Sequence, residues 1–193
     1  MTEHIKRYIQ KQYPNLIELT EECSSVEAII PSEFNTITAV TKIIVGQMLS
    51  RKAAETIYSR VQSGLDKSKK DLHEITISEL REAGVSQRKA QAITNFFKLY
   101  KTDPAKFNNW QHLDYQELYE QVSTIWGISS WTASMLAIFH YANEDVFPYS
   151  DGTIKRALER LQHRGINIDP SLAKPYRSYL ALYLWKFIDE QII

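Results

Sequence analysis

Apolar residues recur along most of the chain with the spacing of a helix face. Between residues 34 and 49 they stand at positions 37, 40, 43, 44 and 48, the three-to-four-residue period of one side of an α-helix. Serine is preferred at the N-cap, the residue just before a helix, and Ser50 and Ser86 each precede a stripe of this kind. Strand-like alternation is scarce, so we predict an all-α fold. The expected helices cover residues 2–12, 34–49, 51–61, 77–83, 87–100, 115–125, 131–141, 151–162 and 175–192.

Residues 131–141 form the most apolar of these stripes and are expected to be the central buried helix. After a loop that contains Pro148, Asp151 stands where the next helix is expected to start. Aspartate is preferred at that position because its carboxylate accepts the free backbone N–H groups of the first turn. Residues 13–32 are expected to be irregular, and the small and basic residues 63–70 to form a loop.

Charge and cysteine content narrow the classes of function. The chain has 193 residues with 23 basic and 23 acidic side chains, so its formal net charge is zero. This balance counts mildly against nucleic-acid binding, which depends on neutralising phosphates. The bases cluster, however, at 51–52, 67–70, 88–89, 155–156 and 160–164, which suits either one basic face or ordinary solvated helix faces. The single cysteine, Cys23, cannot build a disulfide or a four-cysteine metal cluster.

The chain is expected to reside in the cytoplasm and to have no membrane partner. No apolar run approaches the length that crosses a bilayer. The first residues lack the apolar core of a signal peptide.

Four short blocks follow one another in the sequence. They are Ile-Val-Gly-Gln-Met-Leu-Ser at 44–50, Ala-Gly-Val-Ser-Gln-Arg-Lys-Ala at 83–90, Gly-Ile-Ser-Ser-Trp-Thr-Ala at 127–133, and Lys-Pro-Tyr-Arg-Ser at 174–178 with Trp185. In this order they resemble the helix-hairpin-helix DNA glycosylase superfamily, and within it the 3-methyladenine DNA glycosylase II branch. The resemblance spans roughly residues 35–190.

The resemblance implies a two-lobed helical fold with its active site in the cleft between the lobes. Residues 1–34 and 143–193 are expected to form a terminal lobe. Residues 35–142 are expected to form a central lobe, which carries the hairpin at about 113–142. The two lobes together make one compact unit.

The same resemblance implies a monofunctional DNA N-glycosylase of base excision repair. It would flip alkylated purines, such as 3-methyladenine and 7-methylguanine, out of duplex DNA and release them by hydrolysis. Asp151 is the implied catalytic carboxylate, since an ionised acid stabilises positive charge on the sugar. A plain helix cap is the alternative role for Asp151, and the two are compatible. Trp131 stands where bifunctional relatives carry a lysine; an indole forms no Schiff base, so no lyase activity is expected.

The implied base pocket comprises Trp131, Trp185 and Met135. The indoles would stack on the flipped base, and Met135 would influence selectivity. The alternative is that both tryptophans are simply core aromatics at helical spacing. Gln47 and Met48 are implied to enter the DNA and fill the gap left by the flipped nucleotide; the alternative for Met48 is an ordinary core position.

The implied hairpin, with Gly127, Ser129, Ser130 and Thr132, would bind the DNA backbone through its amides. Ser129 replaces the family's second glycine, so its side chain either limits the approach of phosphate or adds a donor. Ser130 could instead cap the following helix. No cofactor, no metal in the site and no iron–sulfur cluster are expected; a monovalent cation bound by the hairpin is the one alternative left open.

The expected partner is double-stranded DNA with damaged bases, bound by a monomer without an obligate protein partner. Two alternatives remain: a non-catalytic protein of the same fold that binds DNA damage or unusual DNA structure, and an all-helical protein-interaction domain. Five further side chains near the site have expected structural roles. Arg177 is expected in an ion pair, His140 in the core, Trp126 and Tyr149 as structural aromatics, and Glu144 with Asp145 as solvated acids.

Overall fold

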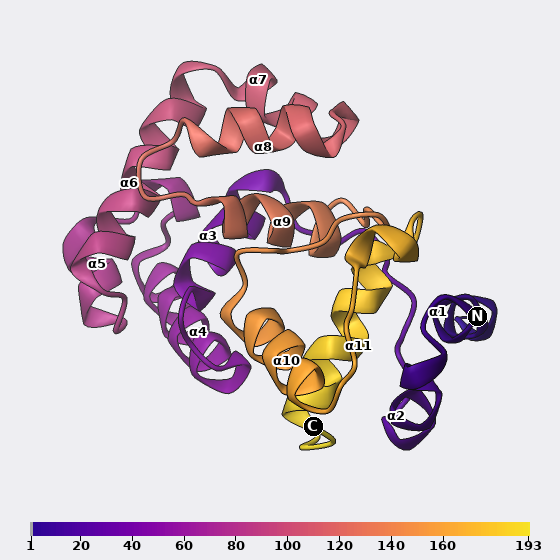
Figure 1. The fold of residues 1–193 in the computed structure, drawn as a ribbon. Helices are drawn as coiled ribbons and strands as arrows, with labels where there is room; N and C mark the ends of the chain where they lie inside the picture. The colour runs from indigo at the N-terminus through magenta and orange to yellow at the C-terminus, as the bar shows by residue number, and fades with distance from the viewer. Residues whose placement is uncertain (1) are drawn as a thin grey trace. The chain divides into compact units, whose positions relative to one another are not determined.

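The computed structural model describes residues 2–193. Helices account for 68% of the chain, and the described residues contain no strand. The all-α prediction is therefore confirmed (Figure 1). The helices are α1 Glu3–Gln12, α2 Ile17–Glu22, α3 Thr36–Gly46, α4 Arg51–Ser68, α5 Ile77–Glu82, α6 Gln87–Thr102, α7 Pro104–Asn108, α8 Tyr115–Ser123, α9 Ser130–Phe139, α10 Gly152–His163 and α11 Arg177–Asp189. Short 3-10 turns are η1 Pro14–Leu16, η2 Leu72–Glu74, η3 Asn109–His112 and η4 Pro170–Ala173.

The chain forms two compact units. The terminal unit consists of Met1–Pro31 and Ala137–Ile193, and the central unit of Ser32–Leu136. The division falls inside α9, so that helix carries the chain from the central unit into the terminal unit. None of the helices within residues 2–193 combines the length and the apolar character needed to cross a membrane.

Two serines cap helices of the central unit at the positions predicted from the sequence. Ser50 accepts the N–H of Ala53 at the start of α4, and Ser86 accepts the N–H of Lys89 at the start of α6. Both predicted caps are confirmed. Helix α3 packs on α4 and α6, and its buried face includes Val40 and Ile44.

Two loop predictions are wrong. Residues 63–68 continue α4: partly buried Leu65 follows the buried Tyr58 and Val61 on one helix face, and Lys69 ends the helix in the left-handed conformation. Residues 17–22 form α2 rather than irregular chain. In α2 the charged residues face solvent, while Thr20 is buried and Leu19 is partly buried.

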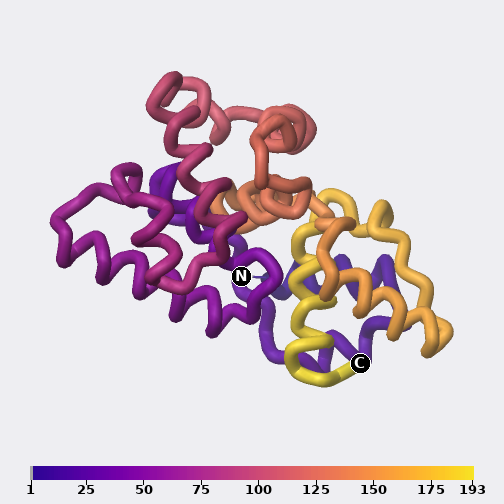
Figure 2. Tube along the Cα trace, turned by 90° about the vertical axis from the view of Figure 1, so that its left-hand side faces the viewer, coloured from indigo at the N-terminus to yellow at the C-terminus, as the bar shows by residue number. Residues whose placement is uncertain are grey.

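The terminal unit has its own apolar core. Ile9 and Leu16 from the N-terminal segment are buried with Ile154 of α10 and Leu184 of α11. Helices α10 and α11 run side by side, as Figures 1 and 2 show. Two tyrosine hydroxyls fasten the N-terminal segment: Tyr8 donates to the carbonyl of Lys174, and Tyr13 to that of Asp169.

One ion pair joins the loop before Asp151 to the start of α11. Arg177 Nε donates to Asp145 Oδ1 over 2.7 Å, and Nη2 donates to Oδ2 over 3.0 Å. The structural role expected for Arg177 is confirmed. The expectation of a merely solvated Asp145 is wrong, because its side chain is only 23% exposed. Glu144 is also engaged, accepting a hydrogen bond from the Tyr179 hydroxyl over 3.0 Å.

Asp145→Asn should lower the free energy of unfolding by about 1–3 kcal/mol, since it removes the charge from a hydrogen-bonded, largely buried pair. Urea unfolding of the intact protein measures this change. Glu3→Gln is the matched control. It removes an exposed pair with Arg7, whose side chains are 77% and 67% exposed, and should change stability by no more than about 0.5 kcal/mol. Equal losses in the two variants would contradict the role given to Asp145.

Candidate functional site

Asp151 is fixed at the N-terminus of α10. Its Oδ1 atom accepts the backbone N–H of Thr153 over 2.9 Å and that of Ile154 over 2.8 Å. The capping role is therefore observed, and the side chain is 8% exposed. A helix N-terminus carries partial positive charge, so it stabilises a carboxylate at this position.

Trp185 brings an indole to the same carboxylate. It projects from α11 and donates its Nε1–H to Asp151 Oδ1 over 3.0 Å. Three hydrogen bonds thus converge on one oxygen and fix the orientation of the acid. The Trp185 ring is partly exposed and lies 5.7 Å, centroid to centroid, from the ring of Phe139. An acid and an aromatic surface therefore stand together in the terminal unit.

Two aromatic side chains of the terminal unit are more exposed than the sequence indicated. Phe139 ends the helix that was expected to be buried throughout, yet it is 46% exposed. Tyr149, expected to be structural, is 60% exposed and meets Phe147 edge to face. Their position at the end of α9 and in the loop before α10 was the available signal, since residues at element ends have fewer neighbours. His140, by contrast, is buried as expected, and burial lowers its pKa.

Met48 stands on a sharp turn in the central unit. Helix α3 ends at Gly46, and Met48 adopts a φ of +56°, which turns it out of the helical stripe. Its side chain is 100% exposed, so the alternative of a core methionine is wrong. Gln47 is held beside it, because its Nε2 donates to the Thr132 hydroxyl over 3.1 Å. The gap-filling role of both residues stays a prediction.

The hairpin residues lie in the turn between α8 and α9 and in the first turn of α9. Gly127 has a φ of +81°, and a Cβ atom there would lie 2.4 Å from the Cβ of Ala92 on α6. Packing therefore requires this glycine, whatever else the turn binds. Ser129 is exposed, and Ser130 is the first residue of α9. Trp126, expected to be structural, is 54% exposed on the same turn.

Thr132 and Met135 lie in the core, as expected for the apolar helix at 131–141. The Thr132 side chain is fully buried and its hydroxyl accepts the Gln47 amide, so it supports Gln47, and the DNA-backbone role of the Thr132 amide stays a prediction. Met135 is 6% exposed, while Trp131, one turn earlier on α9, is partly exposed. The pocket role of Trp131 and Met135 and a cation at the hairpin stay predictions.

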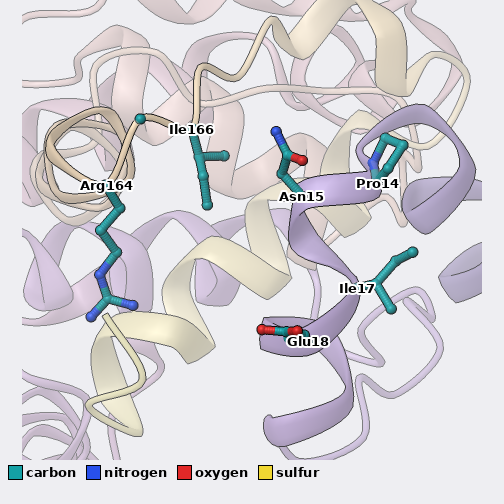
Figure 3. Close-up of a pocket in the computed structure, with 7 residues that line it drawn as sticks. Pro14, Asn15, Ile17, Glu18, Arg164 and Ile166 are labelled. Carbon is teal, nitrogen blue, oxygen red and sulfur yellow. The ribbon is translucent and has the colours of Figure 1, made fainter.

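A hollow in the terminal unit involves none of these residues (Figure 3). Its lining comes from η1, the start of α2 and the end of α10, namely Pro14, Asn15, Ile17, Glu18, Arg164, Gly165 and Ile166. Arg164 has a structural partner, since its Nη1 donates to the carbonyl of Ile192 over 3.1 Å. The acid and the indole described above remain the stronger candidates for chemistry.

Comparison with known proteins identifies relatives. The model of the HhH-GPD superfamily of base excision DNA repair proteins matches residues 41–174. DNA-3-methyladenine glycosylase 1 of Schizosaccharomyces pombe is 28% identical over 159 residues, covering 75% of this chain and 69% of the relative. The alkylbase DNA glycosidase-like protein mag2 of the same organism is 28% identical over 163 residues, covering 76% and 75%.

A solved structure shares the fold. The 3-methyladenine DNA glycosylase of Schizosaccharomyces pombe, in complex with abasic DNA, superposes with a TM-score of 0.77. The alignment covers 96% of this chain and 97% of that one at 22% identity. At this identity the likeness shows the fold alone.

Proposed function

Since the chain belongs to the HhH-GPD superfamily of base excision DNA repair proteins, we propose that it is a monofunctional DNA glycosylase that releases alkylated purines from duplex DNA. The observation that carries this proposal is the carboxylate of Asp151, held at a helix N-terminus and hydrogen-bonded by the indole of Trp185. Relatives named as DNA-3-methyladenine glycosylases support the alkylated purine as substrate.

Asp151 would act on the sugar of the flipped nucleotide. As the bond between C1′ and the base nitrogen breaks, its electron pair leaves with the base and positive charge builds on the sugar. The carboxylate stabilises that charge and orients a water molecule. The water oxygen bonds to C1′, and its proton passes through the carboxylate to solvent. An alkylated purine that carries positive charge leaves as a neutral base, so no separate general acid is needed.

Trp185 would serve both the acid and the base. Its N–H fixes the carboxylate, and its partly exposed ring, backed by Phe139, offers a face for a flat cationic purine. A cation–π contact of this kind is worth about 2 kcal/mol when water is excluded. Trp131 is proposed as a second stacking residue. Because an indole cannot attack the sugar as an amine does, the product is an abasic site on an unbroken strand.

The second candidate function is binding without catalysis. The exposed Ser129 side chain at the hairpin, where the family has a glycine, and the zero net charge favour it. Such a protein would bind abasic or mismatched duplex DNA and release no base.

Purified protein is expected to release 3-methyladenine or 7-methylguanine from methylated duplex DNA and to leave the strand intact. Mass spectrometry of the liberated bases, with gel analysis of the strand, measures both outcomes. Binding to the duplex should weaken as salt rises, because phosphate contacts release counterions. Binding without any base release would favour the second candidate, and salt-independent binding would argue against phosphate contact.

A further inference from the structure

Lys89 is a half-buried cation that faces the backbone of the turn before Met48. Its Nζ atom donates to the carbonyl of Val45 over 2.8 Å and to that of Gln47 over 2.5 Å. Both carbonyls lie at the C-terminal end of α3, where carbonyl groups lack partners within the helix. A cation at this end also stabilises the helix dipole. Burial lowers the pKa of Lys89, which accords with an amine drawn out of solvent.

The turn that Lys89 contacts depends on such support. Met48 has a φ of +56°. This left-handed backbone conformation costs a residue other than glycine about 1–3 kcal/mol of conformational free energy. The Met48 side chain is fully exposed, so no packing around that side chain keeps the backbone in place. Backbone bonds also hold this turn: the N–H of Gln47 donates to the carbonyls of Ile43 and Ile44 over 3.1 and 3.2 Å, and the N–H of Leu49 to that of Gly46 over 3.1 Å. The Gln47 side chain donates to Thr132.

We propose that Lys89 is a positioning residue that holds the backbone of Gln47 and thereby presents Met48 for insertion into DNA. This inference rests on the proposed function. A turn fixed in advance loses less conformational freedom when Met48 enters the stack, so insertion is more favourable. Lys89 accordingly acts through Met48 and touches neither the base nor the sugar.

A direct phosphate contact is the competing role for Lys89, because lysines commonly bind DNA in that way. Two of the three ammonium hydrogens are directed at the carbonyls of Val45 and Gln47, which leaves little capacity for phosphate. Lys98, on the exposed face of the same helix, supplies a matched change of charge away from the turn.

The test compares Lys89→Met with Lys98→Met under single-turnover conditions. One substrate carries the methylated base paired within duplex DNA, and the other carries it in a single strand. Lys89→Met should lose about tenfold on the duplex, the scale set by one hydrogen bond to a charged group. It should change little on the single strand, where no gap in a duplex has to be filled. Lys98→Met should leave both rates near those of the wild type.

The double variant with Met48→Ala separates positioning from general damage to the fold. If Lys89 acts through Met48, the duplex defect of Lys89→Met disappears once Met48 is already alanine, whereas independent effects add. Lys89→Arg keeps a cationic donor and should retain most of the duplex rate. This variant tests the proposal even if Lys89→Met fails to fold. Thermal melting of each variant reports folding.

The outcomes distinguish this inference from the proposed function. A wild-type protein that releases no base from either substrate overturns the proposed function. A wild-type protein that releases base, with equal losses of Lys89→Met on duplex and single strand or with additive effects in the double variant, overturns the positioning role alone.

Discussion

Asp151→Asn is expected to slow base release by roughly 10²–10⁴-fold, the usual contribution of a charged catalytic side chain. The substitution removes the negative charge that the developing sugar cation requires. An asparagine oxygen can still accept the N–H groups of Thr153 and Ile154, and asparagine is as good a helix cap as aspartate. Thermal stability should therefore stay close to that of the wild type. Single-turnover release from methylated duplex DNA, together with thermal melting, measures the two effects.

Asp169→Asn is the control for this experiment. Asp169 also starts a helical turn in the terminal unit and accepts the N–H of Ser171 over 2.9 Å. Its replacement changes charge and capping chemistry in the same way, without touching Trp185 or Asp151. Full activity of Asp169→Asn beside an inactive Asp151→Asn assigns the loss to the site. Undiminished turnover by Asp151→Asn would remove Asp151 from the catalytic role.

Gly127→Ala should give the largest loss of stability, about 2–5 kcal/mol. An alanine at a φ of +81° is strained by about 1–2 kcal/mol. Its Cβ would also overlap the Cβ of Ala92 at 2.4 Å, and overpacking of this kind destabilises by about 1–3 kcal/mol. Urea unfolding measures the sum, and the hairpin should lose DNA affinity as the turn shifts.

Two variants separate the causes of that loss. Gly165 has a φ of +78° with no atom within 4 Å of an added Cβ, so Gly165→Ala should show the conformational strain alone. Adding Ala92→Gly to Gly127→Ala removes the overlapping methyl group and should recover the overpacking part. If Gly165→Ala and Gly127→Ala destabilise equally, contact with α6 does not constrain the hairpin.

Much of the fold follows from local patterns in the sequence. The stripe at residues 37–44 and the serines at 50 and 86 depend on neighbours within one turn, and the structure agrees with each. The end of α3 is different. Apolar periodicity extended that helix to residue 49, but the chain turns at Met48, where long-range bonds to the backbone outweigh the local preference.

The contacts that define the candidate site are less accessible from sequence. Asp151 could be identified as a cap, yet its bond to Trp185 joins residues 34 positions apart and requires α10 and α11 to pack together. The close approach of Gly127 to Ala92 is likewise a contact between distant parts of the sequence, because Ala92 lies on α6 and leaves no room for a Cβ atom at residue 127. Thr132 lies in the helix expected to be buried, and its burial agrees with that expectation, but its bond with Gln47 joins residues 85 positions apart and could not be predicted from local sequence.

The first 31 residues precede the segment matched by the superfamily model, but they are integral to the unit that holds the catalytic candidate. Ile9 and Leu16 are buried in the same apolar core as residues of α10 and α11, and the hydroxyls of Tyr8 and Tyr13 donate to the carbonyls of Lys174 and Asp169 between those two helices. Removing these first 31 residues would expose that part of the apolar core to solvent and should promote aggregation. Recombinant work on a minimal repair module should therefore retain the amino-terminal helices.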